Sequence, residues 1–312
     1  MGVLILGGTG FLGSAAALAL SKENFAVKVL CRTRPAVTLF GDAAIQIYTS
    51  DFAALRPDDS IFDGVDTILH FISATTPASS MQDMAFDVSS NLMPTLNLLE
   101  IMKQRKIPRL IYASSGGTIY GIPKRLPVSE EDVANPICAH GITKLTIEKF
   151  ILLHARLMNL TPVILRIGNP YGSYQLRGVT IGSIARFIHL HSLNKHIEIW
   201  GDGTVVRDYL YIDDFREALA AIVRDPSVPA GVYNLASGTG YSLLDIITQI
   251  ERVTQREVLR TFEHQRLIDV PAITLDISRI CNALPSWQPR TPLAKGIELM
   301  WSAASKKAAD RG

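Results

Sequence analysis

A glycine-rich turn lies close to the start of the chain, between the apolar run Val3–Leu6 and a helical pattern over 11–22. The residues of this turn are Gly7, Gly10, Phe11, Leu12 and Gly13. Glycines let the backbone approach a bound group closely, and the amide N–H groups of the following helix N-terminus hold a pyrophosphate. The spacing therefore predicts a dinucleotide-binding loop.

Short apolar runs alternate with helical patterns after this turn. The expected strands are Val3–Leu6, Val27–Leu30, Ile45–Tyr48, Thr67–Phe71, Leu110–Ala113 and Pro162–Arg166. Long helices are expected over 81–105 and 138–158. Unbroken apolar strands separated by helices indicate a parallel sheet that is covered on both faces. The predicted fold class is α/β, a doubly wound Rossmann-type sheet with a smaller C-terminal substrate domain.

The pattern changes after Arg166. Gly168–Gly178 is predicted to be a loop, and the shorter elements that follow are helices near 180–193, 213–224, 242–254 and 292–304 and a strand near 197–200. The sequence predicts a dinucleotide-binding domain over 1–166, joined by about 204–236. Residues 167–203 and 237–312 would then form the substrate domain.

Composition excludes several classes of protein. The 312 residues include 31 Lys and Arg against 29 Asp and Glu, and 47% are hydrophobic, so a disordered chain is excluded and nucleic acid is not an expected partner. Glycines interrupt the uncharged run 1–21, which argues against a membrane span. Cys31, Cys138 and Cys281 show no metal or disulfide spacing, so no metal site is predicted and a cytoplasmic location is expected.

The end of the second strand bears on which dinucleotide binds. An acidic residue there would bond the ribose of NAD, whereas a basic residue favours the phosphate of NADP. The chain has no acid at this point and carries Arg32 and Arg34, which leaves NADP as an alternative to NAD. Asp51, after the third strand, either contacts the adenine or caps a turn.

Several further motifs occur in a familiar order. They are Ala113–Gly121 (ASSGGTIYG), Pro136–Lys144 (PICAHGITK), Arg166–Gly172 (RIGNPYG), Gly201–Tyr209 (GDGTVVRDY) and Leu275–Arg279 (LDISR). Together with the glycine turn, they resemble the NAD-dependent sugar-nucleotide epimerase/dehydratase family, a group of extended short-chain dehydrogenases/reductases. The resemblance covers nearly the whole chain.

The resemblance implies a catalytic tyrosine and a lysine four residues later on one helix face. Lys144 stands at the lysine position, but His140 stands where the family has tyrosine. The family's Ser or Thr that bonds the reacting hydroxyl aligns with Gly116, so Ser115 is the first substitute and Thr118 the second.

Three interpretations of His140 remain open. A neutral imidazole is a competent base near neutral pH, and the Lys144 ammonium would favour that neutral form. Alternatively Tyr120 or Cys138 acts as the base. In the third interpretation the chemistry is impaired, and the chain only binds its ligands.

The resemblance also implies a substrate site and an activity. Substrate-binding residues would be Asn169, Arg207, Arg266 and Tyr120, with the arginines on the diphosphate of a nucleotide sugar. His70 and Asn91 would have structural roles near the cofactor. The expected activity is epimerisation through transient oxidation at C4, with an NADPH-dependent 4-ketoreductase as the alternative. A homodimer through the helices 81–105 and 138–158 is expected by analogy.

Overall fold

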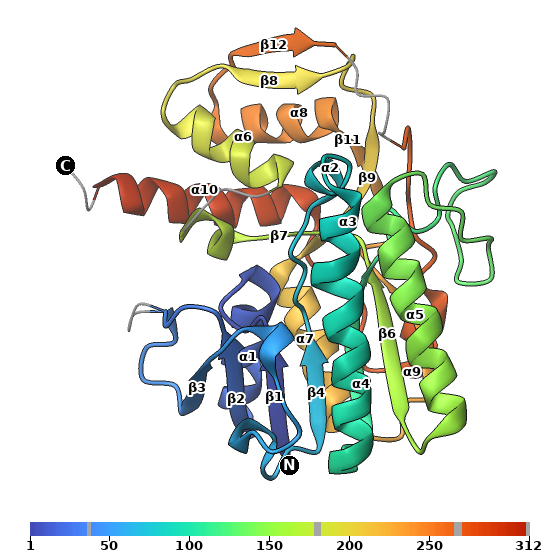
Figure 1. Cartoon of the computed structure of the whole chain (residues 1–312). Helices are drawn as coiled ribbons and strands as arrows, with labels where there is room; N and C mark the ends of the chain where they lie inside the picture. The colour runs from blue at the N-terminus through green and yellow to red at the C-terminus, as the bar shows by residue number, and fades with distance from the viewer. Residues whose placement is uncertain (36–38, 178–181, 265–269, 310–312) are drawn as a thin grey trace.

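The computed structural model describes residues 1–35, 39–177, 182–264 and 270–309. These residues form a parallel seven-stranded sheet in the order β10-β6-β5-β4-β1-β2-β3 (Figure 1). Its strands are β1 (Gly2–Leu6), β2 (Ala26–Cys31), β3 (Ile45–Thr49), β4 (Thr67–His70), β5 (Arg109–Ser115), β6 (Thr161–Ile167) and β10 (Gly231–Leu235). The predicted doubly wound α/β class is confirmed.

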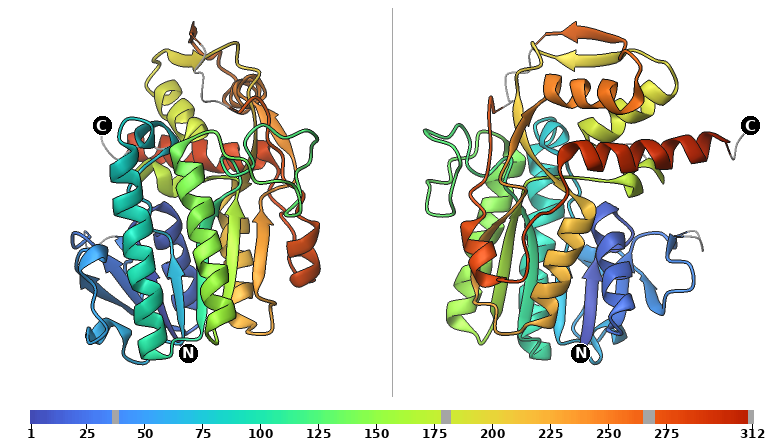
Figure 2. Two further views of the ribbon diagram at one scale, coloured as in Figure 1. Left: turned by 45° about the vertical axis from the view of Figure 1, so that its right-hand side comes forward. Right: turned by 180° about the vertical axis from the view of Figure 1, so that it is seen from behind.

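Helices cover both faces of this sheet. On one face lie α4 (Met93–Arg105) and α5 (Ala139–Leu157), and on the other lie α1 (Phe11–Lys22) and α7 (Ile212–Arg224), as Figures 1 and 2 show. Alternate residues of β1 enter the two cores, because successive side chains of a strand point to opposite faces. Leu4 and Leu6 pack with α4, whereas Val3 and Ile5 pack with α1.

The C-terminal part lies above the carboxyl ends of the strands (Figure 2). It contains a three-stranded sheet and a two-stranded sheet, with α6, α8 and α10 packed together. The strands are β7 (Asn169–Tyr171), β8 (Ile197–Trp200), β9 (Val206–Tyr211), β11 (Gly240–Ser242) and β12 (Arg260–Glu263). The helices of this part are α6 (Ser183–Ser192), α8 (Leu243–Thr254) and α10 (Leu293–Ala309), whereas α9 (Ser278–Ala283) lies beside β10 at the edge of the seven-stranded sheet.

The helix expected over 81–105 starts at Met84 and continues to Arg105, as α3 (Met84–Asp87), a π turn over Val88–Leu92 and α4. A separate short helix, α2 (Pro77–Ser80), precedes it. The side chain of Asp83 caps α3 by accepting a hydrogen bond from the Phe86 N–H, so the helix starts there. The turn between α2 and α3 lies beside the start of α5.

The uncharged run 1–21 forms β1 and most of α1, as predicted. In the part of the chain that the structure describes, no helix combines the length and the apolar character that a membrane crossing requires.

Candidate active site

The glycine-rich turn connects β1 to α1 and forms part of a cavity of about 440 Å³. A Cβ atom built on Gly13 would lie 2.2 Å from the Gly7 carbonyl oxygen, so the first turn of α1 can reach the loop only without a side chain there. The amide groups of this turn and the close backbone approach fit a pyrophosphate.

The predicted cofactor residues divide into two groups. Gly7, Gly10, Arg32 and Asp51 line the cavity, together with Phe71–Ala74 after β4. Phe11, Leu12 and Gly13 are not among its lining residues, and the two apolar side chains pack toward the core. One Asp51 carboxylate oxygen accepts a hydrogen bond from the Ala53 N–H at 2.9 Å, which is the capping role considered from the sequence.

His140, Lys144 and Glu148 form one stripe on α5 that faces the sheet. Their exposed fractions are 8%, 6% and 1%, so the stripe is buried rather than solvated. Glu148 accepts hydrogen bonds from Arg166 of β6, the shortest at 2.8 Å. This buried ion pair fixes the rotation of α5 and thereby holds His140 and Lys144 toward the carboxyl end of β5.

The Lys144 side chain is held against β5. Its Nζ donates a hydrogen bond to the Ala113 carbonyl oxygen at 3.0 Å and lies 4.9 Å from the centre of the Tyr112 ring. Burial lowers the pKa of Lys144 to about 8, and the negative charges of Asp87 and Glu148 oppose that shift. The ammonium form therefore still predominates at neutral pH.

His140 lies one helical turn before Lys144. Burial, and after it the Lys144 cation, lower its pKa to about 4, while Asp87 acts in the opposite direction. The imidazole is therefore neutral at physiological pH and can accept a proton. Its backbone N–H donates to Oγ of the buried Ser80 at 3.0 Å, which fixes the start of α5.

The two hydroxyl candidates lie on the segment after β5. Ser115 is half-buried at the carboxyl end of the strand. Thr118 Oγ1 is buried without a hydrogen-bond partner among the described residues, and its carbonyl lies close to Gly141. A Cβ at Gly116 would lie 2.4 Å from Leu275 Cδ1, so a side chain there would require Leu275 to move.

Asp87 and Thr143 belong to the site but were not predicted from the sequence. Asp87 is fully buried, and its Oδ2 accepts a hydrogen bond from Thr143 Oγ1 at 2.5 Å. The Asn91 amide donates to Asp87 Oδ1 at 3.2 Å, and Asn91 Oδ1 accepts from the Ala74 N–H. The sequence offered one signal for Asp87, its position four residues before Asn91, but the contact with Thr143 of α5 is visible only in the structure.

Of the predicted substrate residues, Asn169 lies at the start of β7 beside Gly117, and Arg207 lies on β9. Arg207 Nη1 donates to the Val270 carbonyl oxygen at 2.6 Å. Arg266 lies outside the described residues.

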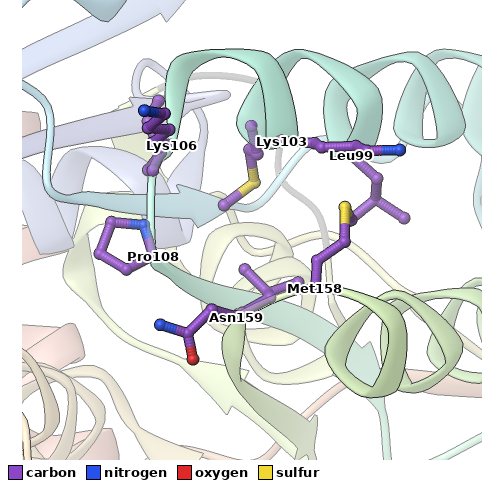
Figure 3. A pocket seen from close by; sticks show the side chains of 9 residues that line it. Leu99, Lys103, Lys106, Pro108, Met158 and Asn159 are labelled. Carbon is purple, nitrogen blue, oxygen red and sulfur yellow. The ribbon is translucent and has the colours of Figure 1, made fainter.

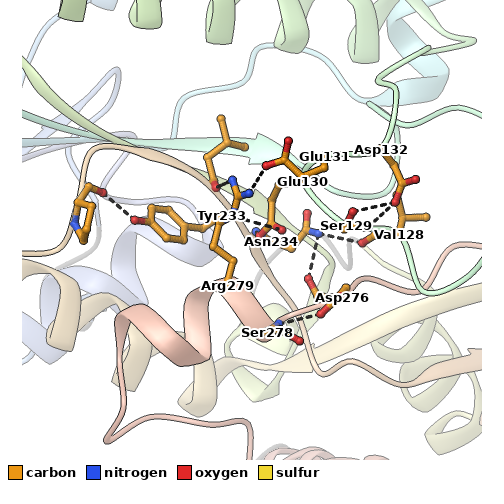
Figure 4. A network of polar contacts seen from close by, with 12 residues as sticks. Val128, Ser129, Glu130, Glu131, Asp132, Tyr233, Asn234, Asp276, Ser278 and Arg279 are labelled. Carbon is orange, nitrogen blue, oxygen red and sulfur yellow. Dashed lines mark hydrogen bonds and ion pairs between the residues drawn. The ribbon is translucent and has the colours of Figure 1, made fainter.

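Tyr120, predicted to bind substrate or to act as the base, is buried and hydrogen-bonded in this structure. Its exposed fraction is 2%, and its hydroxyl donates to Asn234 Oδ1 at 2.7 Å. Burial raises its pKa to about 12. Asn234 also binds the Val128 and Asp276 carbonyls in the polar network of Figure 4. The Tyr120 hydroxyl thus ties the segment before α5 to β10.

A further cavity of about 290 Å³ lies at the other end of the sheet, between the C-terminal ends of α4 and α5 (Figure 3). Its lining is apolar except for Lys103, Lys106 and Asn159. It contains none of the predicted site residues, so the candidate active site is the carboxyl edge.

The buried histidines predict acid sensitivity. The folded-state pKa is about 4 for His140 and about 3 for His70, both below the ordinary value of 6.5, so the unfolded chain binds protons first as pH falls. Stability is therefore full above about pH 6.5, and each histidine should remove about 2 kcal/mol by about pH 5. The test is urea unfolding at several pH values. In His140→Gln the unfolding free energy should fall less with decreasing pH than in the parent, because the histidine is gone. His196→Gln, at an exposed position, should show the same fall as the parent, and the same fall in both variants would contradict the assignment.

Comparisons with known proteins agree with this geometry. A family model described as "NAD dependent epimerase/dehydratase family" matches residues 3–236. A putative UDP-glucose 4-epimerase of Methanocaldococcus jannaschii is 28% identical over 95% of this chain and 96% of its own. A UDP-glucose 4-epimerase of Thermotoga maritima, solved with UDP-glucose, superposes with a TM-score of 0.89 at 25% identity, covering 99% of this chain and 100% of that one.

A UDP-glucuronic acid 4-epimerase of Bacillus cereus, solved with UDP-glucuronic acid and NAD, gives a TM-score of 0.89 at 25% identity. It covers 98% of this chain and 100% of that one. These matches confirm the family resemblance, the enzyme class and the NAD cofactor expected from the sequence. The chain belongs to the NAD-dependent epimerase/dehydratase family.

Proposed function

We propose that this chain is an epimerase that inverts C4 of a nucleoside-diphosphate hexose through transient oxidation at that carbon. The observation that carries the proposal is the buried pair of a neutral His140 and a cationic Lys144 beside the dinucleotide cavity. The epimerase relatives favour this activity over the reductase and binding-protein alternatives.

The residues at the head of α5 and the end of β5 would move and hold the proton. His140 accepts the proton of the sugar 4-hydroxyl and later returns it. Ser115 orients that hydroxyl, with Thr118 as the second candidate. Lys144 holds the cofactor ribose and, through its charge, favours the neutral imidazole. Bound NAD supplies the hydride acceptor.

The substrate would lie between the seven-stranded sheet and the predicted substrate domain, which consists of residues 167–203 and 237–312. Asn169, Arg207 and Arg266 are assigned to the diphosphate. The hydrogen bond to Val270 holds Arg207 in place before substrate arrives, and a guanidinium suits a phosphate because its planar fork donates in pairs.

The first experiment identifies the cofactor and the product together. The chain is purified without added nucleotide, denatured, and the released dinucleotide is identified by mass and absorbance. Native protein is then incubated with UDP-glucose, UDP-glucuronic acid or UDP-N-acetylglucosamine, and the 4-epimer is followed by NMR. Retained NAD with epimer formation supports the proposal. An empty protein that prefers NADPH and forms no epimer rejects it.

We also propose a homodimer through α4 and α5. Large apolar side chains are exposed on these helices, with exposed fractions of 57% for Met93, 53% for Ile142, 45% for Leu153 and 71% for Leu157. Their spacing on α5 places Ile142, Leu153 and Leu157 on one face, away from the buried stripe.

Sedimentation should show a dimer at micromolar concentration that Leu153→Glu converts to a monomer, because a charge would be buried at the interface. Leu299→Glu on α10, also at an exposed leucine, is the matched control and should remain dimeric. A monomeric parent protein would reject the interface.

A further inference from the structure

The segment over 77–92 separates the dinucleotide cavity from the start of α5. Phe86 and Ser90 line the cavity. Asp87, between them in sequence, faces the other way and contacts Thr143 of α5. Figure 1 shows α2 and α3 beside the N-terminal end of α5. The π turn over Val88–Leu92 falls inside this segment, and such turns are frequent at functional sites.

The first turn of α5 depends on this segment for its hydrogen bonds. Cys138 provides no side-chain cap, so the leading N–H groups need other partners. The His140 N–H donates to Ser80 Oγ at 3.0 Å, and the Ala139 N–H points to Met81 Sδ at 3.4 Å. Both acceptors come from the end of α2, so the segment fixes where His140 begins its helix.

Asp87 makes the deepest of these contacts. Its carboxylate is fully buried and accepts hydrogen bonds from Thr143, Asn91 and Thr75. A buried carboxylate is costly to desolvate, and an apolar residue would fill the space at lower cost. Thr143 precedes Lys144 directly and follows His140 by almost one turn. The Asp87 carboxylate is therefore hydrogen-bonded to α5 at a position between the two proposed catalytic groups, His140 and Lys144.

We propose that Asp87 is a positioning residue that fixes the His140–Lys144 turn of α5 against the segment lining the cofactor cavity and supplies the negative charge that Lys144 faces there. The inference rests on the function proposed above. It assigns a role to a carboxylate that does not touch the reacting atoms.

The charges around Lys144 determine what removal of Asp87 would change. Asp87 raises the pKa values of both His140 and Lys144. Glu148 also raises that of Lys144, but Glu148 is already paired with Arg166. The titratable and charged groups around this point are Asp87 from α3, His140 and Glu148 from α5, Arg166 from β6, His70 from β4 and Tyr112 from β5. Neutralising Asp87 leaves Lys144 without its unpaired counter-charge, so both pKa values should fall.

The test compares Asp87→Asn with Asp83→Asn in the NAD-loaded protein. Asp83 caps the same short helix from an exposed position, and asparagine caps a helix equally well. This control therefore removes one negative charge, as Asp87→Asn does, but removes it from the surface. The lysines are labelled with ¹³C at Cε, and the Lys144 signal is assigned by its loss in Lys144→Met. Its titration midpoint reports the local charge without requiring turnover.

In Asp87→Asn the Lys144 midpoint should fall by about one pH unit, and kcat should fall by about tenfold. Asp83→Asn should match the parent in both. An unchanged Lys144 midpoint in Asp87→Asn overturns the proposal. If the parent protein turns over no nucleotide sugar, the proposed function fails, but the titration still tests Asp87.

Thr143→Val is the second variant, which covers the case in which Asp87→Asn does not fold. It keeps the carboxylate and the shape of the side chain but removes the hydrogen bond to α5. We expect kcat to fall by about tenfold with the Lys144 midpoint near that of the parent. A Thr143→Val enzyme with the parent kcat and KM would show that the contact does not position the site.

Discussion

Replacing Lys144 with methionine is expected to lower kcat for epimerisation by about 10²–10⁴-fold, because the cofactor and the proton acceptor His140 both lose the charge that supports them. Lys144 is 6% exposed and its ammonium donates to the Ala113 carbonyl, so water cannot readily replace it in that position. Methionine has a similar length and fills the same space without the charge. The variant should therefore fold and lose turnover.

Steady-state kcat and the retained cofactor should be measured on the same preparation. Lys149→Met is the matched control, because Lys149 is exposed on the same helix and should retain full activity. A Lys144→Met enzyme within threefold of the parent, on the order of 0.6 kcal/mol in the barrier, would remove Lys144 from the proposed mechanism.

The second large effect is expected at His140. His140→Gln should lower kcat by about 10²–10⁴-fold at neutral pH, since the amide keeps a polar side chain but cannot accept a proton. The parent should keep a constant kcat as pH falls from about 7.5 to about 6, because the His140 pKa of about 4 leaves the base neutral throughout. Rates over this range, measured on folded protein, check both statements.

Two companion variants separate the interpretations of His140. Cys138→Ala should retain activity, because burial raises the pKa of the Cys138 thiol and keeps it protonated. His140→Tyr should be slower than the parent if the imidazole is the base. Faster turnover in His140→Tyr would instead support the interpretation that the histidine impairs catalysis.

The sequence was most informative where local signals agreed with the tertiary structure. The helix 11–22 has the predicted bounds because the glycine turn fixes its start and the apolar run continues to Lys22. Each parallel strand from β1 to β6 was visible as an apolar run. β10 was missing from the predicted strands, because its place beside β6 results from a crossover that follows α7 and from no local pattern.

For the candidate site, the sequence identified individual residues but not the neighbours that surround them in the fold. His140 and Lys144 were found from their spacing, whereas the environment that sets their pKa values was not. The place of Asp87 in the site depends on its contact with Thr143 of α5, which lies 56 residues away in the sequence. The hydrogen bond between Tyr120 and Asn234 could not be predicted, because Asn234 lies 114 residues further along the chain.

The buried pair between Glu148 and Arg166 has a consequence for how such a site can change over evolutionary time. His140, Lys144 and Glu148 share one face of α5, and inserting a single residue between them would rotate that face by about 100°. Such an insertion would break a buried ion pair, at roughly 3–5 kcal/mol, whereas exchanging the side chain at 140 leaves the pair intact. The fold therefore tolerates substitutions at position 140 but not insertions or deletions between residues 140 and 148. Glu148 and Arg166 should covary among homologues.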